Sequence, residues 1–112
     1  MFRKCCVCNR CCCNRTMDKF DIIMEELKQM VNRGALLIDV RSPQEYNEGH
    51  LEGAIVLPDY EVRKKINMIV PDKNKTIVVY CDTGIRSKNV NRFLRKIGYI
   101  NVYNLYKGTQ NY

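Results

Sequence analysis

The sequence predicts an α/β fold built on an open sheet whose strands are mostly parallel. Short apolar runs alternate along the chain with segments in which apolar residues recur at helical spacing. The connections between these segments are short, which favours alternating strands and helices. The run Ala35-Leu36-Leu37-Ile38 is apolar throughout, as expected for a parallel strand whose sheet carries helices on both faces.

The first predicted elements lie around that strand. Apolar residues recur at helical spacing over 20–31, which predicts a helix. Asp18 or Asp21 is expected to cap its start, and Gly34 stands where a C-terminal cap belongs. A buried strand is then expected over 35–40.

The same alternation continues to the end of the chain. Proline and glycine indicate the turns, and β-branched residues indicate the strands. The expected elements are a short helix from Pro43, a strand at 54–57, a helix from Asp59 to about Ile69, a strand at Ile77–Tyr80, a helix from Ser87 to Ile97 and a last strand near 101–105.

Length and charge limit the class of protein. A chain of 112 residues suits one domain with a single core. Its net charge of +7 is uneven, because residues 1–16 hold four basic residues and no acid. Residues 17–112 hold the other fifteen basic residues against twelve acidic ones, which leaves +3. A body this mildly basic does not predict a nucleic-acid partner.

Membrane and secretion signals are also missing from the sequence. No apolar run approaches the roughly 20 residues that span a bilayer. No apolar stretch follows the basic N-terminal residues, as it would in a secretory signal. We therefore expect a cytoplasmic protein without membrane association.

Six of the seven cysteines lie within Cys5–Cys13, and the seventh is Cys81. Cysteines packed so closely cannot bridge distant parts of a fold. Residues 1–16 are therefore predicted to be a disordered, cysteine-rich basic leader, followed by a domain over 17–112 in which Met17 is a candidate start of translation. The Cys-x2-Cys spacings of the leader could bind zinc or an iron–sulfur cluster, carry lipid or relay sulfur to Cys81. These alternatives stay open, and no metal site is assigned.

Cys81 stands directly after the most apolar strand and directly before a helix, where ligands of parallel sheets gather. The thiolate is the reactive form of cysteine. A helix N-terminus, inward-pointing backbone N–H groups and the cation of Arg86 favour an anion here, and Gly84 permits a left-handed turn close to a ligand. The predicted site comprises the catalytic residue Cys81 and a substrate-binding loop of Asp82, Thr83, Gly84, Ile85, Arg86 and Ser87.

The spacing of this loop favours sulfur over phosphate. Cys81 and Arg86 form a Cys-x4-Arg pattern, one residue shorter than the Cys-x5-Arg loop of phosphatases, so its ring of N–H groups suits a single sulfane sulfur. Transfer of such a sulfur needs no strong general base. The one histidine, His50, is expected to be a structural hydrogen-bonding residue, and a Cys–His pair is the alternative.

Three motifs stand in order along the chain: LIDVRSPQEY at 37–46, GHLEGAIVLP at 49–58 and VVYCDTGIRS at 78–87. Together they resemble the rhodanese family over nearly all of residues 20–108. The resemblance implies a sheet of about five strands with helices on both sides. It also implies that Cys81 takes sulfur from thiosulfate or a persulfide donor and passes it to a thiol or other thiophilic acceptor. Asp39, Arg41 and His50 would be structural, and no cofactor is expected.

The chain departs from the family pattern at two places. Asp82 follows the cysteine, where many sulfurtransferases of this kind have a basic residue. A carboxylate there would disfavour the dianion thiosulfate, so a protein or small-molecule persulfide is the expected donor. Lys107-Gly108 stands where paired glycines are common. The alternative function is a rhodanese-like binding or regulatory module without turnover.

Overall fold

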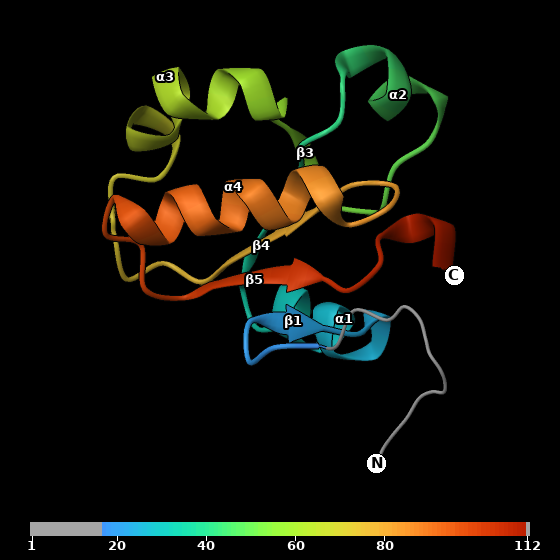
Figure 1. Ribbon diagram of the computed structural model, residues 1–112, viewed down its shortest axis with the longest axis horizontal. Coiled ribbons are helices and arrows are strands. Elements are labelled where there is room, and N and C mark those ends of the chain that lie inside the picture. Colours follow the sequence, from blue (N-terminus) through green and yellow to red (C-terminus); the bar gives the residue numbers. More distant parts are fainter. Residues whose placement is uncertain (1–16, 112) are drawn as a thin grey trace.

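The computed structural model describes residues 17–111. The leader at 1–16 and every prediction made for it lie outside the described residues. Helices and strands alternate along the rest of the chain (Figure 1). The elements are β1 (Asp21–Ile22), α1 (Met24–Asn32), β2 (Leu36–Asp39), α2 (Pro43–Glu48), β3 (Ile55–Val56), α3 (Asp59–Ile69), β4 (Ile77–Tyr80), α4 (Ile85–Lys96), β5 (Val102–Leu105) and a 3-10 helix, η1 (Thr109–Asn111).

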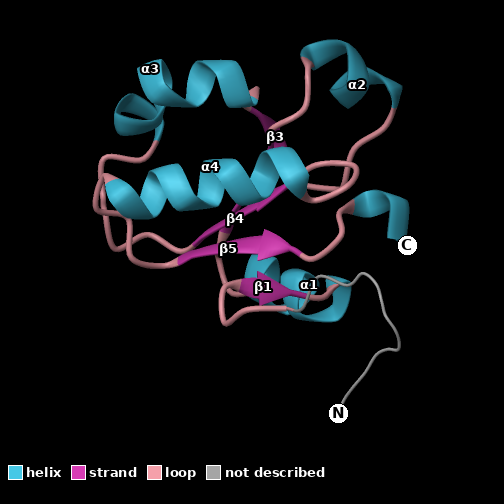
Figure 2. Ribbon diagram, viewed as in Figure 1, coloured by secondary structure: helices cyan, strands magenta, loops and turns pink. Residues whose placement is uncertain are grey.

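The strands form one sheet of five in the order β1-β5-β4-β2-β3, and Figure 2 shows them between the helices. Each neighbouring pair is parallel, which confirms the predicted open α/β sheet. The central strand β4 pairs with β2 on one side, where Ile38 lies opposite Val79, and with β5 on the other, where Val79 lies opposite Asn104. The carboxyl ends of β2, β4 and β5 therefore meet at one edge of the sheet.

Two apolar clusters lie on opposite faces of the sheet. The alternation of side chains along β4 divides its residues between them. Ile77 and Val79 join the cluster that α3 and α4 cover, whereas Val78 and Tyr80 join the cluster that α1 covers. Helices thus pack on both faces, as the apolar strands predicted (Figure 1).

The predicted first helix is wrong at its start. It begins at Met24, and Asp21–Ile22 is instead the edge strand β1, paired with Asn104 and Leu105 of β5. Pairing with the sheet edge satisfies the backbone there, and this outweighs the helical spacing of the side chains. Neither Asp18 nor Asp21 caps the helix, because the cap position is Ile23 and its N–H is bound by the Glu26 side chain.

Most other boundaries agree with the sequence. Ser42 caps α2 by accepting the N–H of Glu45, with Pro43 in the first turn. Helix α4 begins at Ile85, two residues before the predicted Ser87, because Gly84 in the left-handed conformation immediately precedes it. No helix within the described residues 17–111 is long and apolar enough to cross a membrane.

Truncating Leu94 tests the packing of α4 on the sheet. Leu94 is 0% exposed in the cluster that α3 and α4 cover. Leu94→Ala is expected to lower the free energy of unfolding by about 2–5 kcal/mol, because it removes buried methyl groups and leaves a cavity. The control Met68→Ala, at a side chain 77% exposed on α3, is expected to change it by less than about 0.5 kcal/mol. Equal losses of unfolding free energy in the two variants, measured by urea denaturation, would contradict this packing.

Candidate active site around Cys81

Cys81 lies between β4 and α4, at the edge where the parallel strands end. This is the position at which α/β sheets bind ligands. Its side chain is buried, with 0% of the residue exposed. The backbone around it is held by the segment after β5, because the N–H of Thr109 donates to the Cys81 carbonyl at 3.0 Å and that of Gln110 to the Asp82 carbonyl at 2.9 Å. The loop is thereby tied to two neighbouring strand ends.

Close approach of this segment requires glycine at position 108. Gly108 has a φ of +68°, and a Cβ on it would lie 2.2 Å from the Asp82 carbonyl oxygen. Lys107, directly before Gly108, also adopts the left-handed conformation, with a φ of +59°. Gly84 faces the same segment, since its φ is +88° and an added Cβ would lie 3.1 Å from the Lys107 nitrogen.

Two backbone N–H groups point at the sulfur of Cys81. The N–H of Gly84 donates to Sγ at 3.1 Å and that of Ser87 at 3.4 Å. The Ser87 hydroxyl lies 3.4 Å from the same sulfur. Both donors belong to the start of α4, whose partial positive charge faces the sulfur. The arrangement can stabilise an anion on Sγ, or on an atom bound to it.

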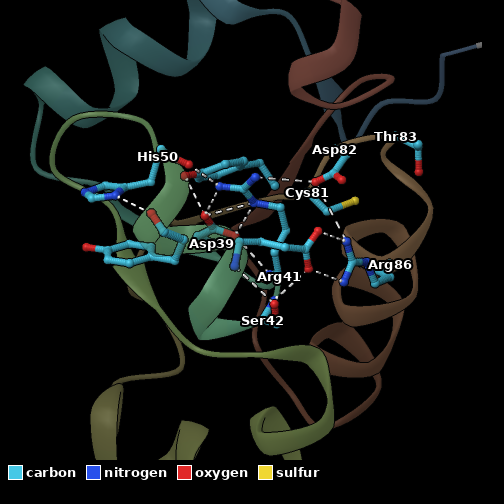
Figure 3. A network of polar contacts seen from close by, with 12 residues as sticks. Asp39, Arg41, Ser42, His50, Cys81, Asp82, Thr83 and Arg86 are labelled. Atoms are coloured by element: carbon cyan, nitrogen blue, oxygen red, sulfur yellow. Dashed lines mark hydrogen bonds and ion pairs between the residues drawn. The ribbon is translucent and has the colours of Figure 1, made fainter.

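Two of the predicted loop residues, Thr83 and Ile85, lie away from the sulfur. Thr83 and Ile85 are exposed, and the Thr83 hydroxyl accepts the N–H of Ile85 at 3.4 Å. Figure 3 shows Thr83 at the outer side of the loop, whereas Asp82 and Arg86 lie beside Cys81. Of the six residues predicted to bind substrate, Gly84 and Ser87 therefore contact the sulfur directly.

The cation predicted at Arg86 is paired with acidic groups. Its guanidinium donates to both oxygens of Glu45, at 3.1 and 3.0 Å. Asp82 Oδ1 lies 3.7 Å from Arg86 Nη2 and 3.6 Å from Arg41 Nη1. The carboxylate of Asp82 thus lies between two arginines, which partly offset its charge. Glu45 was not among the predicted site residues, although it belongs to the first motif.

A second group of contacts holds Arg41 in place. Asp39 is fully buried and accepts from Arg41 Nε and Nη2, at 3.0 and 2.8 Å, and from the Tyr80 hydroxyl at 3.0 Å. The hydrogen bonds that Arg41 donates to Asp39 raise the pKa of Arg41, and burial raises the pKa of Tyr80. Arg41 also donates to the Gly49 carbonyl. Asp39 and Arg41 therefore brace the loop, in keeping with the role that the resemblance implied.

His50 lies outside this cluster of contacts. Its ring stacks on Tyr46, with centroids 3.7 Å apart, and its Nδ1 lies 2.9 Å from the Tyr46 carbonyl oxygen. Its ring is drawn on the far side of Asp39 from Cys81 in Figure 3. These contacts favour the structural role over the Cys–His pair.

The structure adds three residues behind the loop that sequence reasoning missed. Ser87 Oγ contacts Asn104 Oδ1, Asn104 Nδ2 donates to Asp21 at 3.0 Å, and Lys88 Nζ binds both Asp21 oxygens. The one signal in the sequence is a polar residue, Asn104, among the otherwise apolar residues of strand β5.

Comparison with known proteins shows the family to which this fold belongs. A model of the rhodanese-like domain matches residues 24–112. The chain therefore belongs to the rhodanese-like domain family. A solved structure, the rhodanese with anions from E. coli, superposes with a TM-score of 0.64 at 38% identity, over 70% of this chain and 92% of that one.

Two curated relatives show how varied this family is. The chain is 45% identical over 67 residues to thiosulfate sulfurtransferase PspE of Escherichia coli K12, which covers 60% of this chain and 64% of that protein. It is 38% identical over 82 residues to the tRNA uridine(34) hydroxylase of Sodalis glossinidius, which covers 70% of this chain and 23% of that protein. The chain thus spans less than two thirds of the first relative and about a quarter of the second.

The Glu45–Arg86 pair predicts how stability depends on pH. The hydrogen bond from Arg86 holds the pKa of Glu45 at about 2, below its usual 4.5. The folded state therefore gains stability from this carboxylate above about pH 4.5, and loses it as pH falls toward 2. Glu45→Gln is expected to flatten this part of the stability profile, measured by urea denaturation at several pH values. Glu48→Gln, an exposed control on the same helix, should keep the wild-type slope; identical slopes in all three proteins would show that the pair contributes nothing.

Proposed function

We propose that the chain is a sulfurtransferase, which moves a sulfane sulfur from a donor to a thiol acceptor through a persulfide on Cys81. The observation that carries this proposal is the convergence of the Gly84 and Ser87 N–H groups on a buried cysteine sulfur. Such donors stabilise the negative charge that sulfur carries in each step. The 45% identity to a thiosulfate sulfurtransferase supports the same reaction.

The reaction has two steps, and both balance. In the first, the Cys81 thiolate attacks the sulfane sulfur, an S–S bond forms, and the donor leaves with the electron pair as sulfite or as a thiolate. In the second, an acceptor thiolate attacks the outer sulfur, and Cys81 leaves as a thiolate. Because Sγ is fully covered in this structure, a donor reaches it only when neighbouring side chains move.

The position of Arg86 favours sulfur over phosphate transfer. In a phosphate-binding loop an arginine would bind the transferred group through its fork of N–H donors. Here both arms of Arg86 bind Glu45. The N–H groups that remain directed at Sγ are few and close, which suits one sulfur atom better than a tetrahedral phosphate.

A persulfide is the donor that this site suits best. Asp82 keeps a negative charge beside Cys81, although Arg41 and Arg86 partly offset it. A thiosulfate dianion meets this charge, whereas a protein or small-molecule persulfide brings less charge to the site. A reducing compartment such as the cytoplasm would keep Cys81 available as a free thiol.

Loading of Cys81 with sulfur is the direct test. The protein is incubated with thiosulfate or polysulfide, alkylated and digested with trypsin. Cys81 is then the one cysteine of peptide 76–86, which is separated from the peptides that hold the six leader cysteines. We expect this peptide to gain the mass of one sulfur atom. Cys81→Ser should abolish both this gain and the release of sulfite from thiosulfate.

A negative result would change the assignment. If peptide 76–86 gains no sulfur from any donor while the protein stays folded, the domain is a binding or regulatory module. A gain confined to the leader peptides would place the sulfur carrier there and contradict the role of Cys81.

Neutralising Asp82 tests the choice of donor. Asp82→Asn keeps the shape of the side chain and removes its charge, so the KM for thiosulfate is expected to fall about three- to tenfold. The KM for a small persulfide donor, which carries less charge than the thiosulfate dianion, should change less. Glu52→Gln makes the same change of charge at an exposed residue and serves as the control. An unchanged thiosulfate KM in Asp82→Asn would show that Asp82 does not select the donor.

A further inference from the structure

A chain of buried polar contacts extends from Cys81 to the edge of the sheet. It runs through Ser87, Asn104 and Asp21, which are 0%, 2% and 8% exposed, and ends at Lys88. The proposed steps of sulfur transfer do not use Asn104, Asp21 or Lys88. Because these groups are buried, they must satisfy one another's hydrogen bonds. The direction of each bond can therefore be worked out from the charged end, using the donors and acceptors that each side chain has.

The charged end is the Asp21 carboxylate, which receives only donors. Lys88 Nζ lies 2.9 and 2.8 Å from its two oxygens, Asn104 Nδ2 lies 3.0 Å from one, and the Asp18 N–H lies 3.1 Å from the other. This set of partners fits an ionised carboxylate. Although burial acts against it, hydrogen bonds to Asp18 and Asp21 raise the pKa of Lys88, which keeps its ammonium group charged.

The carboxylate sets the orientation of the Asn104 amide. Nδ2 must face Asp21, because the reverse orientation would place the amide oxygen against a carboxylate oxygen with no proton between them. Oδ1 therefore faces the Ser87 hydroxyl. Since an amide oxygen only accepts, the Ser87 hydroxyl donates its one proton to Asn104, and the Gly84 carbonyl, 3.3 Å from Oγ, is a second and longer acceptor.

The Ser87 hydroxyl is then left as an acceptor toward Cys81. Its proton is engaged by Asn104, so at 3.4 Å from Sγ it can accept the S–H of a thiol but cannot donate to a thiolate. We propose that Asn104 is a positioning residue that, held by Asp21 and Lys88, keeps the Ser87 hydroxyl as an acceptor toward Sγ and so withholds its proton from the sulfur. The two backbone N–H groups are left to stabilise the anion when the thiol ionises.

The consequence is a restrained nucleophile. A free serine hydroxyl beside Sγ would donate to the thiolate and favour it at all times. Here that hydrogen bond competes with the bond to Asn104. The other charged groups around Cys81 are Asp82 of the loop, Arg86 of α4, Arg41 after β2 and Glu45 of α2. They lie apart from this chain of contacts, so substitutions at Asn104 leave them in place.

The test is the pH dependence of Cys81 alkylation. Iodoacetamide labelling of the full chain is followed on tryptic peptide 76–86, which separates Cys81 from the leader cysteines. The midpoint of the rate profile reports ionisation, and the plateau at high pH reports access. In Asn104→Leu the Ser87 proton can turn to the thiolate, a charged and therefore stronger acceptor than the neutral Gly84 carbonyl at 3.3 Å, so the midpoint should move down and labelling at pH 7 should become about tenfold faster.

A double-mutant cycle separates positioning from loosening of the fold. In a Ser87→Ala background, Asn104→Leu should leave the midpoint unchanged, because no hydroxyl proton remains to be redirected. Asp21→Leu at the sheet edge should act like Asn104→Leu, because loss of the carboxylate frees the Asn104 amide to turn. Asp21→Leu replaces Asn104→Leu in the test if Asn104→Leu does not fold. Asn101→Leu, just before β5, should leave the midpoint at the wild-type value.

Two results would overturn the proposal. One is an unchanged midpoint in folded Asn104→Leu and Asp21→Leu; the other is an equal shift with and without the Ser87 hydroxyl. The inference concerns the site of the proposed sulfur transfer, but labelling needs no sulfur donor. Its failure would leave the persulfide chemistry standing, and a failure to load sulfur would leave the labelling result valid.

Discussion

The hydrogen bonding of the Cys81 sulfur by the first turn of α4 is the interaction on which the rest of the site depends. It requires a left-handed turn at Gly84, a helix that begins at Ile85, and a loop carbonyl that the segment after β5 can reach. Gly108 permits that approach, because any side chain there would meet the Asp82 carbonyl. The sulfur is therefore held by backbone groups whose positions are set by the ends of β4 and β5, and only secondarily by side chains.

Charged side chains lie on two sides of this sulfur and act differently on it. On the side of α2, Glu45, Arg86, Asp82 and Arg41 form an ion-paired group that sets the charge which an approaching donor meets. On the side of β1, Lys88 and Asp21 act at a distance, by orienting the amide of Asn104. The first group thus bears on which molecule enters, and the second on how readily the thiol ionises.

The sequence was sufficient for the parallel sheet, its helices and the place of Cys81, because apolar runs and glycines report burial and turns locally. The prediction failed at β1, because the helical spacing over 20–31 concealed a strand that forms only by pairing with β5. The paired residues Asp21 and Asn104 are 83 positions apart in the sequence. The role of Asn104 was invisible for the same reason, since its partners come from β1 and α4. Glu45 could be read as a capping residue, whereas its pairing with Arg86 depends on the packing of α2 against the loop.

The central claim is that Cys81 both accepts a sulfur and passes it on, and a single-turnover chase tests it most directly. Protein loaded from a donor labelled at the sulfane sulfur is freed of excess donor and mixed with a thiol acceptor, and the label on peptide 76–86 is followed with time. The account predicts one labelled sulfur per folded chain, which moves to the acceptor as it leaves the peptide. A label that never enters this peptide, or that stays on it in the presence of acceptor, would contradict the assignment of Cys81 as a sulfur carrier.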